Sequence, residues 1–228
     1  MYTNETIKKC VGMMHKRGAE LSALPVEQIK ICISAGNRKI GRVMNVSLPP
    51  VLTCANCSGC VHLCYDIKAC MQYPNTVIDA RMRNHAILTR DRTEYFKRIE
   101  QAISRRRKNK YFRWHVAGDI VDIDYFDNMV RIAQEHSDFV FWTYTKNYKV
   151  VNAWCAEHGK DAIPSNLSVM FSEWRGMSMD NPYNFAEFRV VFKDEQKPQG
   201  FYCPGNCDVC KAANRGCVAR ETVYCMEH

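Results

Sequence analysis

The chain has 228 residues, of which 46% are apolar and 25% are charged, and its formal net charge is +8 at pH 7. These values are typical of folded proteins with a hydrophobic core, and they exclude the very small domains that depend on disulfide staples. The 13 cysteines therefore need a chemical reason. No segment resembles a signal peptide or a membrane span, so we expect a cytoplasmic protein without membrane contact, whose thiols stay reduced.

The first 50 residues predict little regular structure. We expect a helix over residues 3–17, followed by two short strands that are joined by a Gly36-Asn37 turn and ended by Pro49. The turn at residues 34–39 carries two cations. It is either a contact for an anionic ligand or a plain hairpin turn.

The next feature is a short loop with four cysteines at the spacing C-x2-C-x2-C-x3-C: Cys54, Cys57, Cys60 and Cys64. Bacterial ferredoxins use this spacing for an iron–sulfur cluster, because soft thiolates from one short loop can converge on a small inorganic core. Ferredoxins have proline after the fourth cysteine, whereas Tyr65 follows here. We therefore expect a 4Fe-4S cluster with three ligands, preferably Cys54, Cys60 and Cys64, with Cys57 and Cys70 in reserve. A structural zinc site is the alternative.

Residues 76–110 predict two helices, since Asp91 and Glu94 form a capping box between them. The second helix ends in the strongest basic segment of the chain. This segment is either a solvated helix end or a contact for nucleic acid. Its cations are Arg105, Arg106, Arg107, Lys108 and Lys110.

Strands and helices then alternate regularly. Such alternation is typical of βα units with right-handed crossovers and a parallel sheet, and these units are too few for a complete eight-stranded barrel. We therefore expect an α/β fold with a partial, open, barrel-like parallel sheet. The expected strands are 111–118, 139–145, 166–174 and 188–192, and the expected helices are 119–136 and 146–159.

Polar residues gather where these strands end, which is where parallel α/β folds bind ligands. Asp119, Lys146 and His115 are the catalytic candidates. Asp119 could instead cap the next helix, and His115 could be a satisfied core residue. Glu173 and Arg175 could instead pair with each other. The residues expected to bind a cofactor are Gly118, Asp119, Thr145, Lys146, Asn147, Glu173 and Arg175.

A second cysteine-rich segment follows near the other end of the chain. It predicts a metal-binding tail at residues 196–228, separate from an α/β core at residues 1–195. Its spacing does not distinguish a structural zinc from an auxiliary iron–sulfur cluster. The expected ligands are Cys203, Cys207, Cys210 and Cys217.

The order of several short motifs resembles one known family. SAGNRKIG, the Cys64-Tyr65 pair, DARMRN, FRWHVAGD, FWTYTKN and the C-terminal cysteines are similar to the phage family called gene product 88. Asp66 stands where family members usually have alanine, and Cys57 is an addition. The resemblance implies a reduced relative of radical S-adenosylmethionine proteins in the host cytoplasm, and it implies no established activity.

Two functions remain open from the sequence. The first is an iron–sulfur enzyme resembling radical S-adenosylmethionine proteins, which uses S-adenosylmethionine and acts on nucleic acid or a nucleotide. The second is a non-catalytic protein, stabilised by zinc or iron–sulfur, that binds nucleic acid through residues 105–110.

Overall fold

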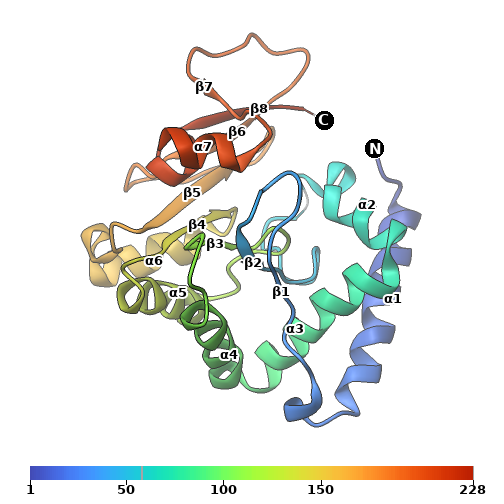
Figure 1. Cartoon of the computed structure of the whole chain (residues 1–228). Helices are drawn as coiled ribbons and strands as arrows, with labels where there is room; N and C mark the ends of the chain where they lie inside the picture. The colour runs from blue at the N-terminus through green and yellow to red at the C-terminus, as the bar shows by residue number, and fades with distance from the viewer. Residues whose placement is uncertain (58, 228) are drawn as a thin grey trace.

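The sheet at the centre of the molecule has eight strands in the order β1-β2-β3-β4-β5-β6-β8-β7 (Figure 1). The computed structural model describes residues 1–57 and 59–227. Neighbouring strands are parallel, except that β1 and β2 are antiparallel. The strands are β1 (Ile33–Ser34), β2 (Met44–Val46), β3 (Tyr111–Trp114), β4 (Val140–Thr145), β5 (Leu167–Glu173), β6 (Glu187–Val191), β7 (Phe201–Tyr202) and β8 (Val223–Met226).

The sheet is open, as the sequence predicts. Its edge strands are β1 and β7, and no pairing among the described residues joins these two edges. The fold is a mixed α/β fold on an open, mostly parallel sheet, and the barrel-like character that the sequence predicts for this sheet is not confirmed. No helix within residues 1–57 and 59–227 has the length and apolar character needed to cross a membrane.

The helices between residues 79 and 158 lie within the predicted segments, whereas the first helix extends to Ser22, beyond its predicted end at residue 17, and the helices at residues 65–72 and 207–213 are not predicted. Asp91 caps α4 by accepting a 2.9 Å hydrogen bond from the backbone N–H of Glu94, which confirms the predicted division into two helices. Asp122 caps α5 in the same way. The helices are α1 (Asn4–Ser22), α2 (Tyr65–Gln72), α3 (Asp79–Arg90), α4 (Arg92–Ser104), α5 (Ile123–Glu135), α6 (Tyr148–His158) and α7 (Cys207–Ala213).

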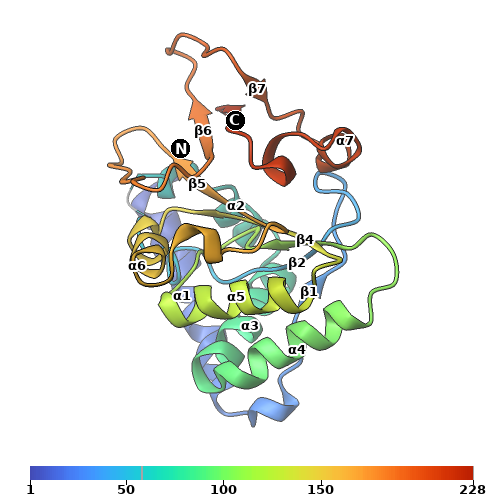
Figure 2. The same ribbon diagram turned by 90° about the vertical axis from the view of Figure 1, so that its left-hand side faces the viewer.

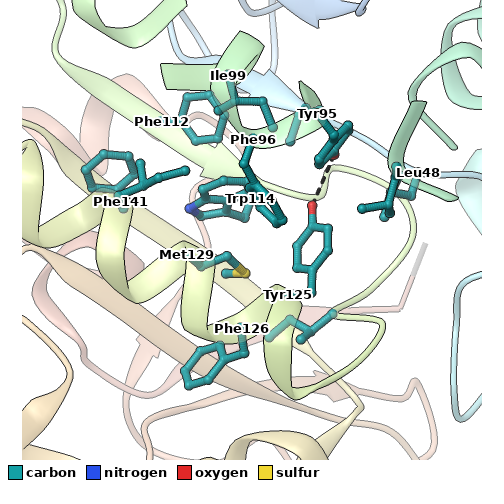
Figure 3. Packing of buried hydrophobic residues seen from close by; sticks show 14 of the residues in the cluster. Leu48, Tyr95, Phe96, Ile99, Phe112, Trp114, Tyr125, Phe126, Met129 and Phe141 are labelled. Carbon is teal, nitrogen blue, oxygen red and sulfur yellow. Dashed lines mark hydrogen bonds between the residues drawn. The ribbon is translucent and has the colours of Figure 1, made fainter. Parts of the chain in front are cut away.

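The two faces of the sheet pack against different parts of the chain. On the face that we call the helix face, Phe112 and Trp114 of β3 pack against Phe96 and Tyr125 from α4 and α5 (Figure 3). The Tyr125 hydroxyl lies 3.1 Å from that of Tyr95, so the polar ends of these rings satisfy each other.

The opposite face, which we call the tail face, is covered by the C-terminal segment. Trp142 of β4 packs there with Met170 and with Cys217 of the tail. Figure 2 shows α7 on one side of β2 and β4, with α4 and α5 on the other. Successive side chains of a strand point to opposite faces, so β3 and β4 contribute to both.

The tail contains regular structure that the sequence does not predict. β8 pairs in parallel with both β6 and β7, so the C-terminal residues continue the same sheet. β7 has two residues, and its neighbours are rich in glycine and cysteine, which hides the usual alternation.

Candidate metal centres

The cysteine loop, residues 54–64, lies over the carboxyl ends of β3, β4 and β5. The Asn56 side-chain amide donates a 2.5 Å hydrogen bond to the backbone oxygen of Lys146, just beyond β4. A Cβ atom on Gly59 would lie 2.7 Å from Cγ of Met177, which follows β5. A Cβ on Gly118 would lie 2.8 Å from Oγ1 of Thr53. The loop is thus in contact with segments that follow β4 and β5, and Thr53, directly before the loop, lies beside the segment that follows β3.

The first two loop cysteines contact each other. The Cys54 thiol donates a hydrogen bond to Cys57, which raises the pKa of Cys54 and lowers that of Cys57. The backbone N–H of Val51 also faces both sulfur atoms and favours their thiolate forms. Val51 has φ 69°, a strained conformation for a β-branched residue, so the surrounding contacts hold the entry to the loop in place.

The last loop cysteine begins a helix. Cys64 is the N-cap of α2, and backbone N–H groups of Asp66 and Ile67 point at its sulfur. Burial raises the pKa of Cys64 to about 11, although these N–H groups act in the opposite direction. A metal would displace the proton here, and the helix N-terminus would then stabilise the thiolate.

The reserve ligand Cys70 lies elsewhere. It is buried between α1 and α2, and its thiol is hydrogen-bonded to the thiol of Cys10. The structure therefore does not bring Cys70 to the loop. Asp66 forms a 3.1 Å ion pair with Arg81. This pair lies beside Cys70 and fixes α2 to α3.

Asp119 joins the ends of β3 and β4. Its buried carboxylate accepts hydrogen bonds from Thr145 Oγ1 at 2.6 Å, from the Lys146 backbone N–H at 2.8 Å and from the Ile120 backbone N–H at 2.7 Å. Burial raises the pKa of Asp119, and these donors oppose the rise. The side chain of Asn147 closes the same loop by donating to the Ile120 oxygen at 2.8 Å. The arrangement fixes the position of Lys146.

Lys146 is the cation nearest to the loop cysteines in this network. Its ammonium donates a 3.0 Å hydrogen bond to Ser172 Oγ at the end of β5 and lies 5.9 Å from the ring centre of Trp174. Burial raises the pKa of Cys60, and the Lys146 charge lowers it. Lys146 can therefore contact both a loop thiolate and an anionic group bound at the strand ends.

Other predicted strand-end residues have different neighbours. Glu173 lies 3.4 Å from Arg189, whereas Arg175 pairs with Asp194 at 2.6 Å and with Glu195 at 3.1 Å. The structure therefore does not contain the predicted alternative, an ion pair between Glu173 and Arg175. Arg175 is tied to an exposed turn after β6.

His115 belongs to the helix face. It is 2% exposed, its Nε2 lies 2.9 Å from the Tyr125 hydroxyl, and its ring packs beside Trp114. Burial lowers the pKa of His115 to about 3, with a smaller contribution from the charge of Arg113. His115 is therefore a buried, neutral histidine that packs among aromatic rings, as a core residue does.

The tail cysteines form a second group on the tail face. Pairing of β7 with β8 brings Cys203 beside Cys225, and the backbone N–H of Cys203 donates to the Tyr224 oxygen at 2.7 Å. A hydrogen bond from Cys225 lowers the pKa of Cys203. The Tyr144 hydroxyl donates to Cys217 Sγ at 2.9 Å. Cys225 is not among the predicted ligands, because its eight-residue distance from Cys217 gives no motif.

Positive charges surround the tail cysteines. Burial raises the pKa of Cys207 and Cys217, and the guanidinium of Arg113 opposes that rise at both. Lys211 acts on Cys207 in the same direction. An uncompensated buried cation is costly, and metal-bound thiolates would neutralise it. The tail therefore supplies soft donors beside cations that would offset the charge of metal-bound thiolates, although burial alone disfavours the thiolate form of Cys207 and Cys217.

The eight predicted ligands are free thiols in the structure: Cys54, Cys57, Cys60, Cys64, Cys203, Cys207, Cys210 and Cys217. Within residues 1–57 and 59–227, no group of three or more His, Cys, Asp or Glu side chains is close enough to hold a metal ion. Binding would therefore draw these thiols together. Their chemistry, and the donors and cations around them, fit a metal–thiolate centre.

Comparison with known proteins gives one match. The sequence model of the gene product 88 family covers residues 23–225, which include both cysteine groups and the whole sheet except Met226, the last residue of β8. The chain belongs to the gene product 88 family. Neither a curated protein nor a solved structure matches it.

In this gene product 88 protein, the basic segment 105–110 lies at the opposite edge of the sheet from the cysteine loop. The segment precedes β3, whereas the loop contacts the residues that follow it. Arg105 and Arg106 line a groove of about 290 Å³ with β1 and β2, and Lys110 pairs with Asp138.

The turn at residues 34–39 contacts the tail, and not the loop that follows it in sequence. Asn37 Oδ1 accepts hydrogen bonds from the backbone N–H groups of Lys39 at 2.9 Å and Ile40 at 3.0 Å, which is the geometry of a hairpin turn. The Lys39 oxygen accepts from the Cys207 N–H at 3.2 Å. Figure 2 shows this turn close to α7.

Proposed function

We propose that the protein is an iron–sulfur enzyme related to radical S-adenosylmethionine proteins, with its reactive cluster on the loop at residues 54–64. The observation that carries the proposal is the position of this loop over the carboxyl ends of β3, β4 and β5, where parallel α/β folds bind their ligands. Cys54, Cys60 and Cys64 are the proposed ligands of a 4Fe-4S cluster. With three protein ligands, such a cluster supplies an open iron and an electron for a bound small molecule.

The strand-end side chains would bind and orient that molecule. Lys146 is held by Asp119 through its backbone, its ammonium donates to Ser172, and its charge lowers the pKa of Cys60. It is the proposed partner of the carboxylate of S-adenosylmethionine. Thr145, Asn147 and Gly118 build the loops around it. The proposed substrate is nucleic acid or a nucleotide, in keeping with the net charge of +8.

The tail would hold a second centre with a supporting role. Cys203, Cys207, Cys210 and Cys217 are the proposed ligands of an auxiliary iron–sulfur cluster, with zinc as the alternative metal. The free thiols at the eight predicted ligands are in keeping with the reducing cytoplasm of the host.

A second candidate function is a non-catalytic, metal-stabilised protein that binds nucleic acid through residues 105–110. The exposure of Arg105, Arg107 and Lys108 favours it, because these cations are available to phosphates at the edge far from the loop. The two candidates predict different roles for the metal, which is reactive in the first and structural in the second.

The test begins with protein purified without oxygen. We expect a brown protein that contains iron and acid-labile sulfide and that, once reduced, cleaves S-adenosylmethionine to 5′-deoxyadenosine. Lys146→Met should abolish this cleavage, whereas Lys149→Met, which removes an exposed lysine of α6, should leave it unchanged. A colourless protein loaded with zinc would contradict the proposal and favour the second candidate.

A further inference from the structure

The tail face carries two neighbouring buried donors that lack an acceptor. Arg113 of β3 is paired in register with Trp142 of β4, so their side chains stand next to each other on this face. Arg113 Nε and Trp142 Nε1 are both buried, and neither has a hydrogen-bond partner among the described residues. Buried donors in folded proteins are nearly always paired, so this position requires an acceptor.

The tail cysteines pack against this pair of donors. Trp142 belongs to the same apolar cluster as Cys217, and Cys203 and Cys207 pack on that cluster. The guanidinium of Arg113 lies 4.6 Å from the ring centre of Tyr144, whose hydroxyl already donates to Cys217 Sγ at 2.9 Å. Ser168 Oγ, in register with Trp142, is also buried without a partner among the described residues. The tail sulfur atoms are acceptors on the same face, since Cys207 and Cys217 lie close enough to interact with the charge of Arg113.

We propose that Arg113 and Trp142 are positioning residues of the tail centre, which donate hydrogen bonds to its sulfur atoms and, through Arg113, offset the charge of its thiolates. The inference rests on the proposed metal centre in the tail. Donors of this kind hold metal-bound sulfur in place, and their loss weakens metal binding without removing a ligand.

The test isolates the tail. In a background with Cys54, Cys57, Cys60 and Cys64 changed to serine, any bound metal belongs to the tail, and its transfer to a chelator is followed with time. Arg113→Gln should speed this transfer by about tenfold or more. Trp142→Phe should speed it by a factor of roughly three to ten.

Trp114→Phe is the matched control. Trp114 Nε1 is also buried without a partner among the described residues, but Trp114 lies on the helix face, in register with Thr143. Its loss should leave the transfer rate unchanged, although it removes an indole of the same size from a neighbouring position.

The possible outcomes separate the inference from the proposed function. If Arg113→Gln and Trp142→Phe release metal no faster than Trp114→Phe, the inference is wrong and the tail centre stands. If the background protein binds neither iron nor zinc, the tail centre is wrong and the inference falls with it. Arg113→Lys keeps the charge and should give an intermediate rate, so it serves as the measurement if Arg113→Gln does not fold.

Discussion

The loop and the tail each carry four predicted cysteine ligands, but the fold gives them different surroundings. The loop lies at the carboxyl edge of the sheet. There the charge of Lys146 lowers the pKa of Cys60, and the charge of Asp119 raises it. The tail cysteines lie on the tail face, where Tyr144 donates to Cys217 and the charges of Arg113, Lys39 and Lys211 act on the thiols. These surroundings fit the proposed exchange of a small ligand at the loop and the proposed retention of a metal in the tail.

Replacing one group of cysteines at a time should have the largest effect and tests most strongly whether the loop and the tail have different roles. Changing Cys54, Cys57, Cys60 and Cys64 to serine should abolish cleavage of S-adenosylmethionine completely and leave the metal of the tail in place. Serine in place of Cys203, Cys207, Cys210 and Cys217 should lower stability and leave iron on the loop. Metal analysis and product formation check both results. Retained cleavage in the first variant would show that the loop is not the reactive centre.

The close approach of Gly118 to the segment before the loop can be tested next. Gly118 has φ 82°, and a Cβ atom there would lie 2.6 Å from Cβ of Leu48. Gly118→Ala should therefore lower the free energy of unfolding by about 2–4 kcal/mol and reduce the iron on the loop more than the metal in the tail.

Gly159→Ala is the control for backbone strain. Gly159 has φ 81°, and its added Cβ would meet nothing within 4 Å. It should cost about 1 kcal/mol in chemical denaturation and leave both metals unchanged. Equal effects of the two substitutions would mean that the loop does not depend on contact with Gly118.

The helix face should respond to acid through His115. Its pKa is lowered from 6.5 to about 3 in the folded protein, so the unfolded state binds a proton that the folded state excludes. The resulting stability is present above pH 6.5 and is lost as the pH falls toward 3, by about 1.4 kcal/mol per pH unit. His115→Phe should flatten this part of the profile in urea denaturation. An unchanged slope would show that His115 is not buried as a neutral group.

The smallest expected effect concerns the basic segment. Arg105→Glu, Arg106→Glu and Arg107→Glu together should weaken binding to a DNA or RNA duplex several-fold and reduce its salt dependence, without changing the metal content. The control changes the exposed Lys8, Lys9 and Lys16 of α1 to glutamate, with the same change in net charge. Equal loss in both triple variants would indicate a general charge effect and no specific surface.

The predictable parts of the fold are those with local signals. The Asp91 cap predicts the start of α4, and hydrophobic periodicity predicts the βα units. Both signals depend on residues that are close in sequence. The strands of the tail depend on pairing across the chain, since β8 joins the sheet through β6.

The candidate sites likewise contain some residues that sequence motifs predict and others that only tertiary contacts reveal. Cysteine spacing identifies the loop, whereas the roles of Arg113 and Cys225 come from contacts that no motif records. The placement of His115 in the helix-face core and of Arg175 beside Asp194 likewise follows from tertiary packing.

The most direct test of the account is the iron and acid-labile sulfide content of a variant that keeps the loop cysteines and has serine at Cys203, Cys207, Cys210, Cys217 and Cys225. Prepared without oxygen, it should contain about four irons and four sulfides per chain, as expected for one 4Fe-4S cluster. Its spectrum should change when S-adenosylmethionine is added, because the proposed cluster has an open iron. A folded variant that contains no sulfide, or that binds a single zinc ion, would contradict the account.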